Sequence, residues 1–196
     1  MKTVLDSPSR SSLTPERWIE AATDVLADQG IDSVRVDSLA RALKVTRGSF
    51  YWHFRDRDDL LRAVLQAWRT QATEQLTRRL ESARDDPRDQ IRDLISLPFR
   101  GRAAVRAARI ELAIRAWARR DDRARAFVDE ADAARIGYIA QVFSSLGFSI
   151  TEARARAFLL YSYELAESLL ASQGTASQRS ERAQLVERLI QLKLPK

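Results

Sequence analysis

Residues 46–54 bring polar, basic and aromatic side chains together in one short segment. Their sequence, Thr-Arg-Gly-Ser-Phe-Tyr-Trp-His-Phe, supplies hydroxyls, an arginine and a histidine, and two phenylalanines four positions apart that can anchor one helical face. Hydroxyl and guanidinium groups are donors for phosphate oxygens and base edges. Because residues 36–45 predict another short helix and a tight turn, the pair favours a helix-turn-helix whose second helix enters the DNA major groove.

Four residues at the start of this segment have distinct predicted roles. Thr46 is expected to cap the helix and to donate to a phosphate. Arg47 is the best candidate for reading a base edge, since its fork matches guanine, although a solvated surface arginine is the plain alternative. Gly48 allows a close approach of the backbone to DNA, and Ser49 offers a short hydroxyl. The alternative for these two is a small, tightly packed face.

The residue inventory argues against catalysis and metal binding. His53 is the only histidine and the chain has no cysteine, so thiol chemistry, thiolate metal sites and sites with several histidines are excluded. The sequence shows no clustered carboxylate metal motif and no glycine-rich phosphate loop. We therefore expect neither an enzyme nor a bound cofactor.

Charge gives local rather than global evidence for DNA binding. The net charge is +6, but residues 1–69 hold 11 basic and 10 acidic residues, so most of the excess lies later, including an arginine-rich run from Arg100 to Arg125. The window from Ser38 to Arg55 has four basic residues and no acidic one. Such a window can meet phosphates without repulsion.

The periodicity of the chain predicts an all-α fold of about nine helices. Glycine and proline are scarce, at 6 and 5, and alternation typical of strands is missing. We expect a disordered leader over residues 1–13, a three-helix head with the helix-turn-helix over 14–60, and a larger helical body over 61–196. A long fourth helix, capped by Asp56, joins head and body. The head should start at Thr14, and Phe50 and Phe54 should lie in its core.

The residues of the head resemble the TetR-type transcriptional regulators. The matching motifs are Leu39-Ala40, Val45-Thr46, the aromatic run of residues 50–54, and the polar-leucine run of residues 57–61. The resemblance is detailed over about residues 14–68 and extends to the body in length and helix order only. It implies phosphate-backbone contacts by Tyr51 and His53, and packing or sugar contact by Trp52. The alternative for Tyr51 is core packing.

Three positions depart from the family pattern. Lys44 stands where a glycine is usual in the turn, so we expect a left-handed lysine at a cost of about 1 kcal/mol and a slightly altered turn. Arg35 replaces a common capping threonine, which loses a cap but offers a phosphate contact. Arg57 replaces the usual lysine at the start of the fourth helix and keeps the charge.

A homodimer is expected, because one helix-turn-helix reads only a few base pairs and two heads about 34–36 Å apart read a palindromic operator. The last two long helices offer apolar faces that would form a four-helix bundle across a two-fold axis, as the resemblance also implies. The alternative is packing within the monomer. The candidate interface residues are Leu160, Tyr161, Leu165, Leu169, Leu185, Val186, Leu189 and Ile190.

The resemblance further implies a small-molecule pocket among the central helices. An effector bound there would favour a conformation with wrongly spaced heads, typically by about 1–3 kcal/mol, and the fourth helix would transmit the shift. The alternative for aromatic residues at helical spacing is plain core packing. The candidate walls are Trp68, Phe99, Trp117, Phe127, Tyr138 and Tyr163, and the candidate polar anchors are Arg115 and Glu164.

The sequence thus predicts a cytoplasmic, dimeric repressor that binds double-stranded DNA and is released by a small-molecule effector. No apolar run is long enough to span a bilayer and the start lacks the apolar core of a signal peptide, so no membrane association is expected. Two alternatives stay open: a non-specific architectural DNA binder using the Arg100–Arg125 run, and a helical enzyme or small-molecule carrier whose head only packs.

Overall fold

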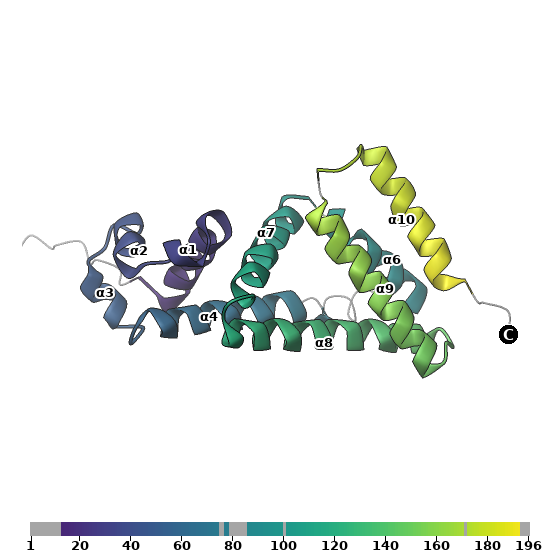
Figure 1. Cartoon of the computed structure of the whole chain (residues 1–196), viewed down its shortest axis with the longest axis horizontal. Helices are drawn as coiled ribbons and strands as arrows, with labels where there is room; N and C mark the ends of the chain where they lie inside the picture. The colour runs from purple at the N-terminus through teal and green to yellow at the C-terminus, as the bar shows by residue number, and fades with distance from the viewer. Residues whose placement is uncertain (1–12, 75–76, 79–85, 100, 171, 193–196) are drawn as a thin grey trace, which may run out of the picture. The chain divides into compact units, whose positions relative to one another are not determined.

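The computed structural model describes residues 13–74, 77–78, 86–99, 101–170 and 172–192. Over these ranges the chain forms nine α-helices and no strand (Figure 1), which confirms the predicted all-α class. The chain divides into two compact units, residues 1–64 and 65–196. We call the first the head and the second the body. The predicted leader lies almost wholly outside the described residues.

The head is built from α1 (Pro15–Gln29), the 3-10 turn η1 (Ile31–Ser33), α2 (Val36–Ala42), α3 (Arg47–Tyr51) and the first part of α4 (Arg57–Arg69). As predicted, Phe50 and Phe54 are buried, with their rings stacked 5.4 Å apart. The ring of Trp18 meets Phe50 edge-on at 5.3 Å. This aromatic cluster therefore holds α3 against α1.

The turn between α2 and α3 is closed by Lys44, whose φ is 57°. The amide of Lys44 donates to the carbonyl of Arg41 at 3.2 Å, and the amide of Val45 donates to the carbonyl of Ala40 at 3.0 Å. This pair of bonds is a Schellman motif, in which glycine is the usual left-handed residue. Lysine thus takes the left-handed backbone as predicted, and the turn has both hydrogen bonds of this motif.

The strain at Lys44 leads to a stability prediction. Lys44→Gly should raise the free energy of unfolding of the head by about 0.5–1 kcal/mol, because glycine adopts positive φ without a Cβ clash. Arg41→Gly, three residues earlier inside α2, is the control and should lower it by about 1 kcal/mol. Urea unfolding followed by circular dichroism measures both. A destabilised Lys44→Gly variant would contradict the strain argument.

The two predicted threonine caps hold the expected positions without the expected bonds. Thr14 and Thr46 are the N-cap residues of α1 and α3, yet neither side chain makes a capping hydrogen bond. The reason is local: the amide three residues on, of Arg17 or Ser49, donates to the threonine carbonyl instead. Asp56 does cap α4, since its Oδ1 accepts from the Asp59 amide at 2.8 Å.

The described body comprises the end of α4, the π-helical turn η2 (Thr70–Glu74), α6 (Pro87–Ser96), the 3-10 turn η3 (Leu97–Phe99), α7 (Gly101–Ala118), α8 (Asp122–Ser145), α9 (Ile150–Leu169) and α10 (Ala176–Gln191). Asp86, Asp121, Ser149 and Thr175 cap four of these helices through their side chains. The long fourth helix that the spacing predicts therefore ends its α-helical part at Arg69 and continues as a π turn.

Helix α9 packs along α8, and α10 lies against α6 and α9 (Figure 1). Ile91, Phe143 and Leu160 are fully buried in the core that these helices share. The buried Arg156 of α9 ties the end of α10 to this core, because its guanidinium donates to the carbonyls of Ile190 and Leu192. Figure 1 shows α10 reaching the same end of the body as the start of α9.

Candidate functional site

The face of α3 presents the predicted DNA-binding side chains to solvent. Thr46, Arg47 and Gly48 are exposed, Tyr51 is half-exposed, and Trp52 is 87% exposed. Ser49 and His53 are partly buried. A fully exposed tryptophan gains nothing from burial in the monomer, so it is available to a partner surface.

Arg47 is held in place by two groups of the head. Its Nη2 donates to the Tyr51 hydroxyl at 3.1 Å, and its guanidinium also lies over the Tyr51 ring, 5.8 Å from the centroid. Its Nε lies 3.6 Å from Oδ1 of Asp37 on α2. The window that carries no acid in sequence therefore has a carboxylate beside its best base reader in space.

Gly48 is not required by the packing of the head. A Cβ built at this position meets only the Thr46 Oγ1, at the ordinary distance of 3.7 Å. The alternative reading of a tightly packed small face is therefore not supported at this position. An open, side-chain-free spot on the exposed side of α3 suits the close approach of another molecule.

Arg35 and Arg57, the two arginines predicted to contact DNA from outside α3, make contacts inside the head. Arg57 is partly buried and donates from Nε to the Val34 carbonyl at 2.6 Å and from Nη2 to the Ile31 carbonyl at 2.7 Å. Arg35 donates from Nε to the Asp32 carbonyl at 3.3 Å. Arg57 thus fixes the start of α4 to the loop before α2, a role that the sequence analysis missed. Its predicted DNA contact stays a prediction.

A network of charged side chains crosses the interior of the body. The guanidinium of Arg135 on α8 makes two 3.0 Å hydrogen bonds to the carboxylate of Glu111 on α7. The guanidinium of Arg115 makes two bonds to Asp132, at 3.0 and 2.5 Å. Both arginines also donate to the Tyr161 hydroxyl of α9, at 2.8 and 2.9 Å. We call these five residues the ion network; of them, only Arg115 and Tyr161 had been singled out from the sequence.

The ion network shifts the pKa values of its members. Burial opposes the charge of Arg135, but the carboxylate of Glu111 outweighs burial and raises the arginine pKa. Burial likewise opposes the charge of Arg115, and the bonds to Asp132 raise its pKa. Burial raises the pKa of the Tyr161 phenol. The two arginines are therefore permanent cations with matched anions.

Glu164 lies on α9, one turn beyond Tyr161, and the pKa of its carboxyl is far from the usual value of a glutamate. Burial raises the pKa of its carboxyl to about 8, the guanidinium of Arg135 lowers it, and the carboxylate of Glu111 raises it. Its Oε1 is shielded from solvent and accepts no hydrogen bond. The predicted polar anchor is thus a carboxyl that is mostly protonated at neutral pH.

The aromatic side chains predicted as pocket walls differ in their surroundings. Trp68 lies beside the ion network, with the Arg135 guanidinium 5.6 Å from its ring centroid. Phe127 lies under the guanidinium of Arg69 at 5.5 Å. Trp117 is buried, whereas 38% of Phe99 is exposed. Tyr138 and Tyr163 are partly buried against the core.

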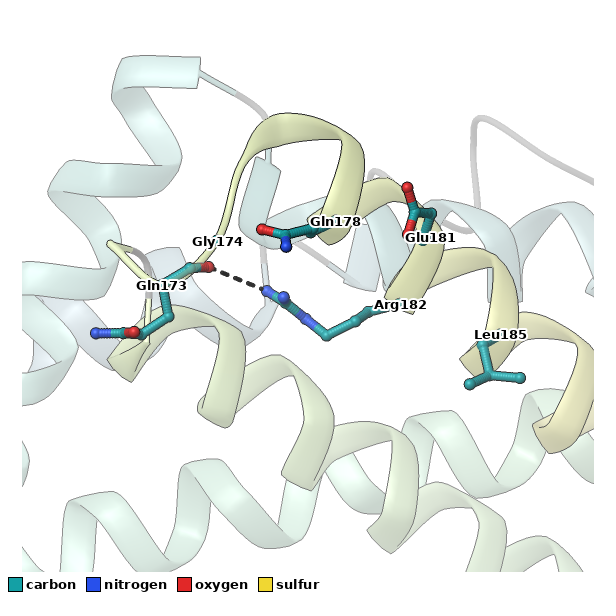
Figure 2. Close-up of a pocket in the computed structure, with 6 residues that line it drawn as sticks. All are labelled: Gln173, Gly174, Gln178, Glu181, Arg182 and Leu185. Atoms are coloured by element: carbon teal, nitrogen blue, oxygen red, sulfur yellow. Dashed lines mark hydrogen bonds between the residues drawn. The ribbon is translucent and has the colours of Figure 1, made fainter.

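An open pocket of about 590 Å³ lies where the chain passes from α9 into α10 (Figure 2). Figure 2 shows Arg182 reaching across it toward the backbone of Gln173, whose carbonyl accepts a 3.4 Å hydrogen bond. The same guanidinium is paired with the buried Glu167 at 2.7 Å. None of the eight predicted ligand residues lines this pocket. Its lining residues are Gln173, Gly174, Gln178, Glu181, Arg182 and Leu185.

The apolar faces of α9 and α10 are only partly those predicted for a dimer. Leu160, Tyr161 and Ile190 are at most 6% exposed, so the interface prediction is wrong for these three, which fill the monomer core. Leu165 and Val186 are partly buried. Several large apolar side chains are 47–62% exposed, and the sequence analysis missed four of them. The exposed set, which we call the apolar face, is Phe158, Leu159, Leu169, Leu170, Leu185, Leu189 and Leu192.

A short polar helix held by an aromatic core behind a Schellman turn is a helix-turn-helix, and the head therefore places the chain in the helix-turn-helix class of DNA-binding proteins. Residues 19–64 match the family model described as "Bacterial regulatory proteins, tetR family". The HTH-type transcriptional regulator SrpR of Pseudomonas putida is 44% identical over 52 residues, which are 26% of this chain and 24% of SrpR. The chain thus aligns with about a quarter of that relative.

Solved structures resemble the chain over nearly its whole length. The reduced form of NemR from E. coli has a TM-score of 0.75 at 19% identity, covering 93% of this chain and 99% of NemR. A transcriptional regulator from Saccharomonospora viridis in complex with choline has a TM-score of 0.73 at 18% identity, covering 90% and 94%. The chain carries the N-terminal domain of the TetR family on the fold of TetR-family regulators.

Within the described part of the chain, each helix is too short or too polar to cross a bilayer.

Proposed function

We propose that this chain is a homodimeric, sequence-specific transcriptional regulator of the cytoplasm, and a repressor released from a palindromic operator by a small-molecule effector. In this proposal residues 14–60 bind DNA, and residues 61–196 bind the effector and the second subunit. The chain acts as a binding protein and not as an enzyme. The curated and structural relatives named above are transcriptional regulators, which supports this class.

The observation that carries the proposal is the exposed face of α3. Trp52 is exposed and Tyr51 is half-exposed, Gly48 leaves the backbone open, and Arg47 is oriented by Tyr51 and Asp37. A guanidinium that is already oriented loses less conformational entropy when it meets a guanine edge. Thr46 is the exposed N-cap residue of α3, and its hydroxyl can donate to a phosphate oxygen.

The effector role rests on the body. Charged groups are costly to bury, and the body keeps five polar residues and Glu164 in its interior. The regulator from Saccharomonospora viridis holds choline, which supports effector binding by a chain of this fold. Helix α4 begins in the head and ends in the body, so it is the element that both units share in sequence.

The architectural alternative is weakened by the ion pairs of the arginine-rich run. Arg115 is bound to Asp132, Arg125 lies 3.6 Å from Asp129, and Arg123 lies 3.8 Å from Asp121. A cation that already has a carboxylate partner releases fewer counterions on DNA. The run is therefore a mixed-charge surface, whereas a non-specific DNA binder needs a bare cationic one.

Selection of bound sequences from a random duplex pool tests the proposed function. The expected result is a palindrome whose half-sites are about one helical turn apart, bound at least 10³-fold more tightly than random DNA at moderate salt. Equal affinity for selected and random duplexes would refute sequence-specific regulation. A non-palindromic site would refute the symmetric dimer.

Two substitutions, one on α3 and one just after its end, are expected to have different effects on DNA binding. Arg47→Ala should cost about 1–3 kcal/mol on the selected sequence and little on random DNA, because it removes a base contact. His53→Ala should weaken both about equally, because phosphates are the same in every sequence. Binding isotherms on both duplexes measure this. The reverse pattern would assign the base contact to His53 and the phosphate contact to Arg47. Arg17→Ala, on the exposed side of α1, is the control.

The apolar face is expected to hold the dimer together. Phe158→Glu and Leu189→Glu each place a charge in the proposed interface, and each should raise the dimer dissociation constant at least 100-fold, about 2.7 kcal/mol. Light scattering coupled to size exclusion measures the mass. Val105→Glu, at an equally exposed apolar position on α7, should leave the dimer intact. If both Phe158→Glu and Leu189→Glu remained dimers, this interface would be contradicted.

A further inference from the structure

The ion network is balanced and closed. Glu111 and Asp132 supply two negative charges, and Arg115 and Arg135 supply two positive ones. Each arginine holds one carboxylate through two hydrogen bonds, and Arg115 also donates to Glu111 at 2.9 Å. The Tyr161 hydroxyl joins the two pairs by accepting from both arginines and donating to Asp132. Any additional charge next to this network must therefore find its partner elsewhere.

Glu164 is the additional group. It lies within the electrostatic reach of Arg135 on α8 and of Glu111 on α7, but no guanidinium is paired with it among the described residues. Its Oε1 is buried and accepts no hydrogen bond. Buried polar atoms are almost always satisfied, so this exception marks a place for a missing partner.

We propose that Glu164 is the anchor for an organic ammonium cation with an apolar body, and that this is the chemical class of the effector. An ammonium group supplies both things that the carboxyl lacks, a hydrogen-bond donor and a positive charge. The Arg135 guanidinium lies over the rings of Tyr161 and Trp68, so the groups beside this carboxyl include two aromatic side chains of the kind that suit a hydrocarbon chain. That the bound cation acts as an effector rests on the proposed function. That the cation binds at Glu164 rests only on the structure of the body.

An anionic ligand fits this place poorly. Both arginines of the ion network already hold carboxylates, so an incoming anion would add a third negative charge beside Glu111 and Asp132 without a free cation to meet it. A neutral ligand could satisfy the hydrogen bond but not the charge. The difference in binding affinity between ammonium, anionic and neutral ligands is therefore the property to measure.

The test uses the full-length protein and three probes of matched shape, which are 4-phenylbutylamine, 4-phenylbutan-1-ol and 4-phenylbutyrate. Calorimetry should show that the amine binds at least tenfold more tightly than the alcohol or the carboxylate. Absence of measurable amine binding at millimolar concentration, or equal binding of amine and alcohol, would overturn the proposal.

Glu164→Gln should remove the preference for the amine and leave the alcohol unchanged. Glutamine has the shape of the protonated carboxyl, so the variant should fold, and its circular dichroism and melting temperature verify this. Asp129→Asn removes a carboxylate from the surface of α8 and should keep the preference. A Glu164→Gln variant that still favours the amine would overturn the assignment.

The dependence on pH gives a second measurement. The pKa of Glu164 is about 8, raised mainly by burial, with Arg135 lowering it and Glu111 raising it, so amine binding must displace a proton at neutral pH. Amine affinity should rise about tenfold per pH unit from 6 to 7 and level off above 8, while alcohol affinity stays flat. A flat amine profile would overturn the proposal.

DNA binding is measured separately on the selected duplex. Amine binding that depends on Glu164 in a protein with no sequence-specific DNA binding would sink the proposed function and keep the ammonium site. Specific DNA binding without the amine preference would refute the ammonium site and keep the proposed function.

Discussion

Arg135→Met is expected to lower the free energy of unfolding of the body by about 1–3 kcal/mol, because it removes two hydrogen bonds from the buried carboxylate of Glu111 and leaves Arg115, whose Nε donates to the same carboxylate at 2.9 Å, as its cation. Only 11% of the Glu111 side chain and 14% of the Arg135 side chain are exposed, so water cannot replace the lost partner. Methionine keeps most of the volume of the arginine stem, which separates the charge effect from a cavity effect. Urea unfolding followed by tryptophan fluorescence measures the change.

A second variant and a surface control complete this prediction. Glu111→Leu combined with Arg135→Met removes both charges and should recover most of the loss, since a buried pair replaced by apolar side chains is often neutral. Arg125→Ala breaks an exposed pair with Asp129 and should change stability by less than about 1 kcal/mol. A loss below about 1 kcal/mol in Arg135→Met would show that solvent reaches the Glu111 carboxylate.

Phe50→Ala is expected to unfold the head and abolish DNA binding. The side chain is fully buried and contacts the rings of Trp18 and Phe54, so its truncation should cost about 3–5 kcal/mol. A unit of about 50 residues has little more stability than that. Circular dichroism should lose the helical signal of the head, while the body keeps its cooperative unfolding transition.

Trp52→Ala is the matched control on the same helix. Because Trp52 is 87% exposed, its loss should leave head stability within about 0.5 kcal/mol of the parent. Both variants can reduce DNA binding, but only Phe50→Ala should do so by unfolding. A folded Phe50→Ala head would contradict the core assignment.

Local signals in the sequence predicted much of the head. Thr14, Asp56 and the short turn at Lys44 mark the ends of elements through backbone preferences that act over a few residues. The spacing of Phe50 and Phe54 predicted their burial for the same reason, since residues four apart share one helical face. The missing side-chain caps at Thr14 and Thr46 could not be predicted, because carbonyl and hydroxyl oxygens compete for the same amide.

The body was less predictable in its details. The sequence marked Leu160, Tyr161 and Ile190 as apolar, but apolar character alone does not separate a monomer core from a subunit interface. Arg115 and Glu164 were expected near a ligand, whereas the nearby charged groups that define their chemistry, Asp132 and Arg135, were not singled out. These partners lie on another helix, and pattern within one helix carries no information about its neighbour.

By itself the sequence determined the class of this protein: an all-helical chain with an N-terminal helix-turn-helix, because helix periodicity, turn chemistry and the aromatic anchors of α3 are local properties. Tertiary structure alone decided which charges meet. It placed Asp37 beside Arg47, turned Arg57 onto the carbonyls of Ile31 and Val34, and closed the ion network while leaving Glu164 outside it. Electrostatic energy depends on distances between side chains, and for residues far apart in sequence only the packing of the helices sets those distances.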